Sequence, residues 1–338
     1  MPDLVLYGGF AVVVAALLAV DLFVVHRESH AVSVKEAATW SGIWIGVAIL
    51  FGLLVPRLHG DGGTEPMIQY FTGYVIEKSL SVDNVFLFIL IFQTFAVPRE
   101  LQHRVLFYGV LGAIIMRTIL IFTGVALIER FEWLLYLFGA FLIYVAVKTW
   151  LHREESENIA DSNIMKLIRR VLPTTDDYRG QRFLIRENGR LLATPMLVVL
   201  ILVEFTDLIF AVDSIPAVFA ITRDPFIVLT SNVFAILGLR ALYFLLAGVA
   251  ARLHYLKAGL AVILGYVGVK LFTENIDGFP HPSPLQSLGV IVLILAVVIV
   301  MSLRRPVEPG EEVPSGVLPF GGEHRAPTTV SDSPPPER

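Results

Sequence analysis

Two long apolar segments of the sequence carry acidic residues in the same arrangement. In each segment an acid is followed six residues later by an Asp, and the next residue is Asn or Ser. Carboxylate, amide and hydroxyl oxygens are hard ligands that suit Mg²⁺, Ca²⁺ or Mn²⁺, whereas Zn²⁺ and Cu⁺ usually take His or Cys, which both segments lack. The sequence therefore predicts a site for a hard divalent cation. The predicted ligands are Glu77, Asp83, Asn84, Glu204, Asp207 and Asp213.

The spacing of these residues leaves two arrangements open. On a regular helix Glu77 and Asn84 share one stripe, while Asp83 points about 120° away. In the second segment Asp213 points away by the same angle from the stripe that the other acids share. Either the second Asp of each segment faces a different neighbour, or the helix is unwound there and both carboxylates face one site. Pro216, three residues after Asp213, favours distortion of its helix.

Membrane helices are the elements that must position these acids. Of the 338 residues, 55% are hydrophobic and 17% are charged, against roughly 25% charged in an average soluble domain, and the mean hydropathy is +0.72. Apolar runs of about 18 or more residues recur, and each can cross a bilayer as a helix. We predict an all-α polytopic membrane protein with about nine transmembrane helices. The predicted ranges are 4–25, 37–55, 67–95, 105–127, 132–150, 192–221, 227–250, 256–273 and 285–303.

The chain also contains an internal repeat, at 67–150 and 192–273. Besides the acidic pattern, the second helix of each unit holds an Arg, at Arg117 and Arg240, and the third helix ends in Tyr-Val-x-Val-Lys. Because each unit has three spans, an odd number, the second copy must lie inverted in the membrane. Two inverted three-helix repeats around a central site are an architecture of many secondary transporters. The alternative is that membrane helices resemble one another by composition alone.

Lys and Arg are distributed unevenly among the predicted connections. One side of the membrane has only Arg57, Arg130 and Arg223, while the other includes a long basic loop. The positive-inside rule places that loop and the C-terminus in the cytoplasm and the N-terminus outside. Outside the repeats we expect an N-terminal two-helix segment, the basic loop, a last transmembrane helix and a disordered tail, at residues 1–66, 151–191, 285–303 and 304–338.

Composition and motifs exclude several classes of function. A net charge of −4 gives no basic excess for nucleic acid. Because the chain has no Cys, it has no disulfide, thiol redox couple or cysteine nucleophile. It has no GxGxxG, CxxCH or Walker A motif, so we expect no prosthetic group, no ATP-driven step and no enzymatic activity. The partners that remain are the lipid bilayer and a divalent metal ion, and the sequence indicates no protein partner.

Two segments resemble the signature segments of the TerC family of integral membrane proteins, in particular its Alx-like branch. They are EKSLSVDNVF, which begins at Glu77, and VEFTDLIFAVDSIPA, which ends at Ala217, while FAILGLR, which ends at Arg240, resembles a third. The resemblance implies manganese export across the bacterial plasma (inner) membrane, and associations with tellurite resistance and redox modulation. It also implies that intramembrane acids handle the metal, at Glu77, Asp83, Glu204, Asp207 and Asp213.

Our leading hypothesis is a secondary transporter that exports Mn²⁺ through a site between the third and sixth spans. A Ca²⁺ or Mg²⁺ exporter would use the same ligands. In one alternative the acids form a structural ion-pair network with Arg117 and Arg240. In another the protein is a non-transporting scaffold of a stress-resistance, tellurite-resistance or redox-modulating complex that binds partners through its basic loop. Asp83→Asn or Asp213→Asn separates the two, because a transporter would lose efflux and a scaffold would tolerate the change.

Overall fold

The computed structural model describes most of the membrane region and part of the long loop. The described residues are 3–23, 34–60, 63–151, 173–175, 178–187, 190–247, 255–273, 276, 279 and 282–304. Most of the predicted basic loop and residues 305–338 of the predicted disordered tail lie outside the described residues.

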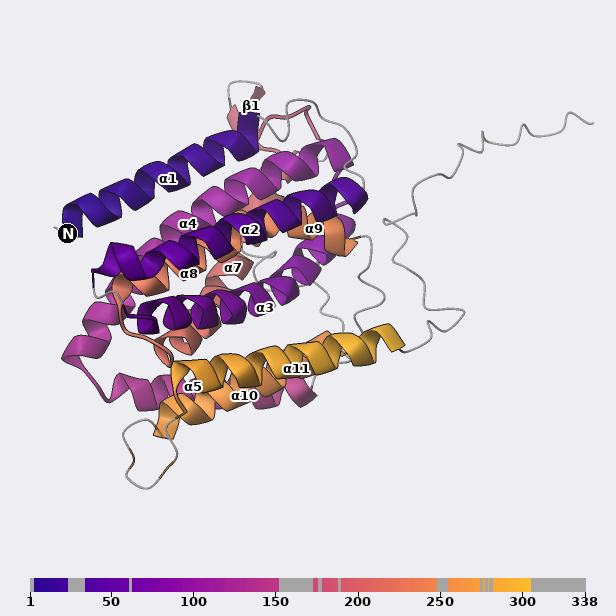
Figure 1. The fold of residues 1–338 in the computed structure, drawn as a ribbon. Coiled ribbons are helices and arrows are strands. Elements are labelled where there is room, and N and C mark those ends of the chain that lie inside the picture. Colours follow the sequence, from indigo (N-terminus) through magenta and orange to yellow (C-terminus); the bar gives the residue numbers. More distant parts are fainter. Residues whose placement is uncertain are drawn as a thin grey trace, which may run out of the picture.

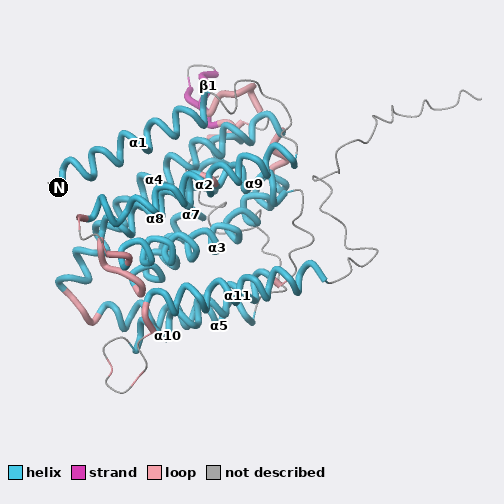
Figure 2. The backbone as a smooth tube through the Cα atoms, in the orientation of Figure 1, coloured by secondary structure: helices cyan, strands magenta, loops and turns pink. Residues whose placement is uncertain are grey.

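The described chain forms a bundle of long helices that lie roughly parallel or antiparallel to one another (Figure 1). The helices are α1 (Asp3–Phe23), α2 (Val34–His59), α3 (Glu65–Thr94), α4 (Arg99–Arg130), α5 (Leu134–Leu151), α7 (Pro195–Phe219), α8 (Pro225–Leu237), α9 (Leu239–Ala247), α10 (Leu256–Thr273) and α11 (Pro284–Arg304). Each predicted span coincides with one of them, the seventh with the pair α8 and α9. Figure 2 shows strand structure only at the hairpin of β1 (Leu184–Glu187) and β2 (Arg190–Ala193), among the described residues.

Hydropathy and length mark most of these helices as membrane spans. Within the described residues, six helices are long and apolar enough to cross a bilayer: α2, α4, α5, α7, α10 and α11. The bent pair of α8 and α9 would be a seventh. The apolar part of α1 is shorter, and α3 contains Glu77, Lys78 and Asp83. The chain is thus a helical integral membrane protein, while a total of nine crossings stays a prediction.

The helix break lies in a different place from the one that Pro216 suggested. Both α3 and α7 are continuous through Asp83 and Asp213, so the hypothesis of unwinding at these residues is wrong. Pro216 is accommodated inside α7 near its end. The seventh span is broken instead, because α8 ends at Leu237 and α9 continues beyond Gly238 at an angle of 42°.

A small part of the long loop packs against the end of α3. The hydroxyl of Tyr178 donates a hydrogen bond to the backbone carbonyl of Phe95 over 2.8 Å. Burial raises the pKa of Tyr178 to about 12, so the hydroxyl keeps its proton and remains a donor at neutral pH. This contact joins the loop to the helix that carries Glu77.

Glycines allow α5 and α10 to pack at short range. A Cβ atom at Gly139 of α5 would lie 2.6 Å from the backbone nitrogen of Phe272 on α10. From the other side, a Cβ atom at Gly268 would lie 3.0 Å from the backbone nitrogen of Ile143. Small residues at such crossings let membrane helices gain van der Waals contact, which is a main source of their association.

We expect Gly139→Ala to destabilise the protein, because the new methyl group meets backbone that cannot move aside as a side chain can. The expected loss of unfolding free energy is about 1–3 kcal/mol, measured by thermal unfolding in detergent. Gly289→Ala on α11 is the matched control, since nothing lies within 4 Å of its Cβ position. Equal melting temperatures for Gly139→Ala and the wild type would contradict this account of the crossing.

Candidate functional site

A buried arginine joins three helices near the middle of the bundle. Arg117 of α4 is 1% exposed and makes a bidentate contact with Asp207 of α7, at 3.1 Å from Nε and 2.9 Å from Nη2. Its Nη1 atom also donates to Glu77 of α3 and, over 3.2 Å, to the hydroxyl of Ser214. We call these residues, Glu77, Arg117, Asp207 and Ser214, the Arg117 cluster.

The Arg117 cluster has more negative than positive charge. Two carboxylates share one guanidinium, and both acids are at most 2% exposed. The Oε1 atom of Glu77 accepts from Arg117, whereas its Oε2 atom has no hydrogen-bonding partner among the described residues. A buried carboxylate oxygen without a partner is costly, so this position favours an additional positive charge or proton donor.

Glu204 lies one helical turn before Asp207 and outside this set of contacts. Its carboxylate rests against Gly112 of α4, where a Cβ atom would overlap it. Glu204 is half-buried, and the described part of the chain offers it no ion pair or hydrogen bond. The absence of a side chain at Gly112 is therefore what lets this acid lie between α4 and α7.

The second Asp of each segment lies away from the Arg117 cluster. Asp83 and Asp213 are both half-buried, whereas Glu77 and Asp207 are buried. Asp213 interacts electrostatically with Lys148 of α5. Of the two arrangements that the spacing left open, Asp213 follows the one in which the second Asp faces a different neighbour.

Three further charges within the bundle have structural partners. Asp21 of α1 forms an ion pair with Arg240 of α9 at 3.0 Å, so this acid stabilises the packing of α1. Lys78 donates through Nζ to the backbone carbonyl of Ala235 over 3.1 Å. Because α8 ends at Leu237, its last carbonyls lack partners in the helix. An ammonium group there donates to one of them and interacts favourably with the negative end of the helix dipole.

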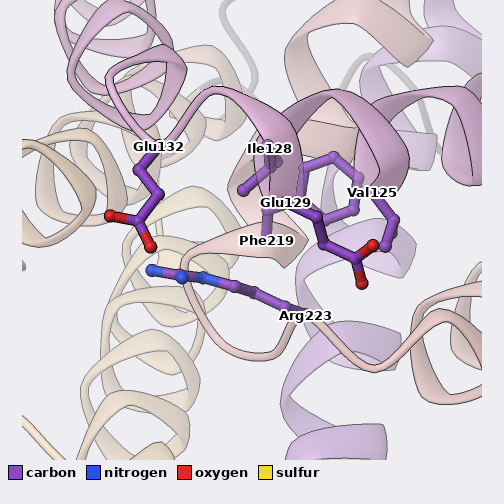
Figure 3. A pocket seen from close by; sticks show the side chains of 6 residues that line it. All are labelled: Val125, Ile128, Glu129, Glu132, Phe219 and Arg223. Carbon is purple, nitrogen blue, oxygen red and sulfur yellow. The ribbon is translucent and has the colours of Figure 1, made fainter.

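Cavities lie on both sides of the Arg117 cluster along α4 and α7. The larger, of about 220 Å³, opens where both helices end, and Figure 3 shows Arg223 extending towards Glu132 on its wall, with Glu129 nearby. Phe219 forms part of its lining. The smaller, of about 10 Å³, lies before Arg117 on α4 and is lined by apolar side chains from α3, α4, α7 and α9 and by Asp207. It offers room for about one water molecule.

A family model described as "Integral membrane protein TerC family" matches residues 62–308. The chain belongs to the TerC family. It is 51% identical over 303 residues to a protein of Escherichia coli K12 named "Putative membrane-bound redox modulator Alx", covering 88% of this chain and 94% of the relative. A membrane protein of Myxococcus xanthus is 50% identical over 298 residues, covering 88% and 92% of the two chains. None of the solved structures matches it. These findings confirm the resemblance seen in the signature segments.

The TerC-family chain brings together only part of the predicted ligand set. Glu77 and Asp207 meet, but Arg117 lies between them, and Asp83, Asn84, Glu204 and Asp213 are not in the Arg117 cluster. Across the described ranges, no group of three or more His, Cys, Asp or Glu side chains is placed to hold a metal ion. The six ligands therefore stay a prediction.

One buried polar residue was not found by sequence reasoning. Asn232 of α8 is 0% exposed, and neither its Oδ1 nor its Nδ2 atom has a hydrogen-bonding partner within the described chain. The signal was present in the sequence, because Thr230, Ser231 and Asn232 form a polar run inside an otherwise apolar span.

Proposed function

We propose that this protein is a secondary transporter that exports Mn²⁺, or a similar hard divalent cation, from the cytoplasm across the bacterial inner membrane. The observation that carries the proposal is the excess negative charge of the Arg117 cluster. Charged groups within a bilayer are expensive and normally face a partner or an ion pathway. Glu77 and Asp207 together need more positive charge than Arg117 supplies, and a dication is one way to provide it.

In this proposal Arg117 and the transported cation compete for the same carboxylates. In the described conformation the guanidinium neutralises part of the charge of Glu77 and Asp207. An arriving dication displaces the guanidinium, and Glu204, one turn away, supplies the next carboxylate. We retain Asp83, Asn84 and Asp213 as further candidate ligands along the path. Oxygen ligands of this kind favour Mn²⁺, Mg²⁺ or Ca²⁺ over softer metals.

The two cavities fit alternating access. With the N-terminus outside, as the Lys and Arg distribution predicts, the cavity at Glu129 and Glu132 faces the exterior and the small cavity beside Asp207 lies on the cytoplasmic side. The wide outer and narrow inner cavities then describe a conformation that is closed towards the cytoplasm. Acidic side chains at the outer mouth favour the presence of cations there.

The packing of the helices supports the proposed inverted repeat. In the repeat, α3 corresponds to α7, and α4 corresponds to the pair α8 and α9. The contact of α3 with α8 and α9 is therefore the counterpart of the contact of α7 with α4, and the structure contains both. The pair of α5 and α10 corresponds to itself. We infer that the two three-helix units, residues 67–150 and 192–273, are related by a pseudo-two-fold axis in the membrane plane.

The redox role in the name of the Escherichia coli relative can be reconciled with metal transport. The chain contains no Cys, so a thiol-based redox reaction has no residue to carry it. We propose that any redox effect is an indirect consequence of cellular metal balance. A scaffold role for the basic loop is the competing proposal.

Purified protein in liposomes that contain a Mn²⁺-sensitive dye tests the proposal. We expect Mn²⁺ flux, and we expect Mg²⁺, Ca²⁺ or Zn²⁺ to inhibit it in the order of their affinity for the site. If protons are the coupling ion, the flux should also respond to an imposed pH gradient. Protein-free liposomes are the control. Correctly inserted protein that moves none of these ions would exclude the transporter and favour the scaffold.

Gly112→Ala tests the position of the Glu204 carboxylate without a large change in the stability of the fold. The new methyl group meets the end of a flexible side chain rather than backbone, so we expect the melting temperature to change little. The carboxylate must move, so the KM for Mn²⁺ is expected to rise by about 5-fold, roughly 1 kcal/mol. Gly46→Ala, with nothing within 4 Å of its Cβ position, is the control. An unchanged KM would remove Glu204 from the proposed ligands.

A further inference from the structure

Asn232 is a buried polar side chain, and neither of its hydrogen-bonding groups is paired within the described part of the chain. Its Oδ1 and Nδ2 atoms have no partners among the described residues, although the residue is fully buried. Its neighbour Thr230 is equally buried but donates to the carbonyl of Phe226 in its own helix over 2.8 Å. A buried amide without partners costs on the order of several kcal/mol, so its presence indicates a ligand.

Contacts between α3 and α8 place Asn232 near the depth of Glu77. A Cβ atom at Gly73 would lie 2.9 Å from the hydroxyl of Ser231, and Lys78 Nζ lies 3.1 Å from the carbonyl of Ala235. The two helices therefore run in the same direction and in register over this stretch. Glu77 lies between the two contact points on α3, and Asn232 lies between them on α8.

The helical stripe of Asn232 faces the centre of the bundle. Ile236, one turn later on the same stripe, belongs to an apolar cluster with residues of α3, α4 and α7, among them Ala113 and Val203. These are the helices that contribute Glu77, Arg117 and Asp207. The Oε2 atom of Glu77, which also lacks a partner among the described residues, is carried by one of these helices.

We propose that the side-chain oxygen of Asn232 is a ligand of the transported cation, next to Oε2 of Glu77. This inference rests on the proposed function and extends its site to α8. Hard divalent cations accept carboxamide oxygens alongside carboxylates. A neutral ligand completes the coordination without adding negative charge, which keeps the cation from being held too tightly to leave.

The first test compares Mn²⁺ flux in liposomes for the wild type, Asn232→Leu and Thr230→Val. Leu keeps the branched shape of Asn but replaces its polar atoms with methyl groups, so we expect the KM for Mn²⁺ to rise by about 10-fold or more in Asn232→Leu. Thr230→Val should behave as the wild type, because Thr230 bonds only within its own helix. Size-exclusion profiles confirm that each variant is folded.

The outcomes separate this inference from the proposed function. A wild type that moves no Mn²⁺ contradicts the proposed function itself. A wild type that transports, together with Asn232→Leu at an unchanged KM, overturns only the role of Asn232. Asn232→Asp adds a negative charge at the same place, and we expect it to lower both the KM and the maximal rate.

A second test uses the absence of cysteine in the chain. In Asn232→Cys the new thiol is the only one, so a small cationic methanethiosulfonate reports on this position alone. We expect modification that Mn²⁺ slows by about 5-fold or more, and no Mn²⁺ effect on Thr230→Cys. A thiol at position 232 that does not react, or that reacts equally with and without Mn²⁺, would overturn the proposal.

Discussion

Arg117→Met is expected to lower the free energy of unfolding by about 3–5 kcal/mol. The substitution leaves Glu77 and Asp207 buried together without the guanidinium that both contact, and breaking a buried ion pair by removing one partner has a cost of this size. Thermal unfolding in detergent measures the effect. Arg130→Met, at the exposed end of the same helix, is the control and should change stability by less than about 0.5 kcal/mol.

The same variant also tests the competition between Arg117 and the cation. Without the guanidinium, a dication is the remaining positive charge for these carboxylates, so Mn²⁺ should raise the melting temperature of Arg117→Met more than that of the wild type. Combining Arg117→Met with Glu77→Gln removes one of the stranded charges and should recover part of the lost stability. If Arg117→Met melts at the wild-type temperature, the ionic contacts do not contribute as described.

Glu77→Gln is expected to reduce Mn²⁺ flux by about 100-fold, roughly 3 kcal/mol, while the protein remains folded. The remaining pair, Arg117 and Asp207, is electrically neutral, so the dication loses the excess negative charge that attracts it. Gln keeps the size of the side chain and can still accept from Arg117. Flux in liposomes and a melting curve on the same preparation measure both effects.

A matched substitution on the same helix controls for this loss. Glu65 is exposed in the first turn of α3, and Glu65→Gln should transport as the wild type does. Full flux in Glu77→Gln would show that this carboxylate serves packing alone. It would then favour the alternative in which the acids form a structural network.

Hydropathy predicted the helices well because burial in lipid imposes a simple requirement on composition. Each predicted range coincides with a helix or with the bent pair, although six helices, or seven with that pair, meet the criterion for a span. The bend at Gly238 was missed because a glycine in an apolar run has the same hydropathy whether or not the helix continues. The bend is accompanied by a hydrogen bond from a helix that is distant in sequence, which Lys78 donates to the carbonyl of Ala235.

The charges of the site were predictable, but their partners were not. Composition and spacing identified Glu77, Asp207 and Arg117 as intramembrane charges, and the repeat suggested equivalent roles for Arg117 and Arg240. The structure gives them different partners, since Arg240 bonds to Asp21 of α1, a helix outside the repeat. Pairing depends on which helices are neighbours in three dimensions, and a single sequence does not specify that. Asn232 was missed for a related reason, because only burial makes an uncharged amide conspicuous.

The narrow apolar cavity beside Asp207 has an electrical consequence. In the proposed orientation, low-dielectric side chains separate Asp207 from the cytoplasm, so part of the transmembrane voltage falls across them. Moving one elementary charge against 100 mV costs about 2.3 kcal/mol, and a dication about twice as much. In the proposed export of Mn²⁺, an interior-negative potential opposes the outward step, and we expect turnover to slow as the bilayer is polarised.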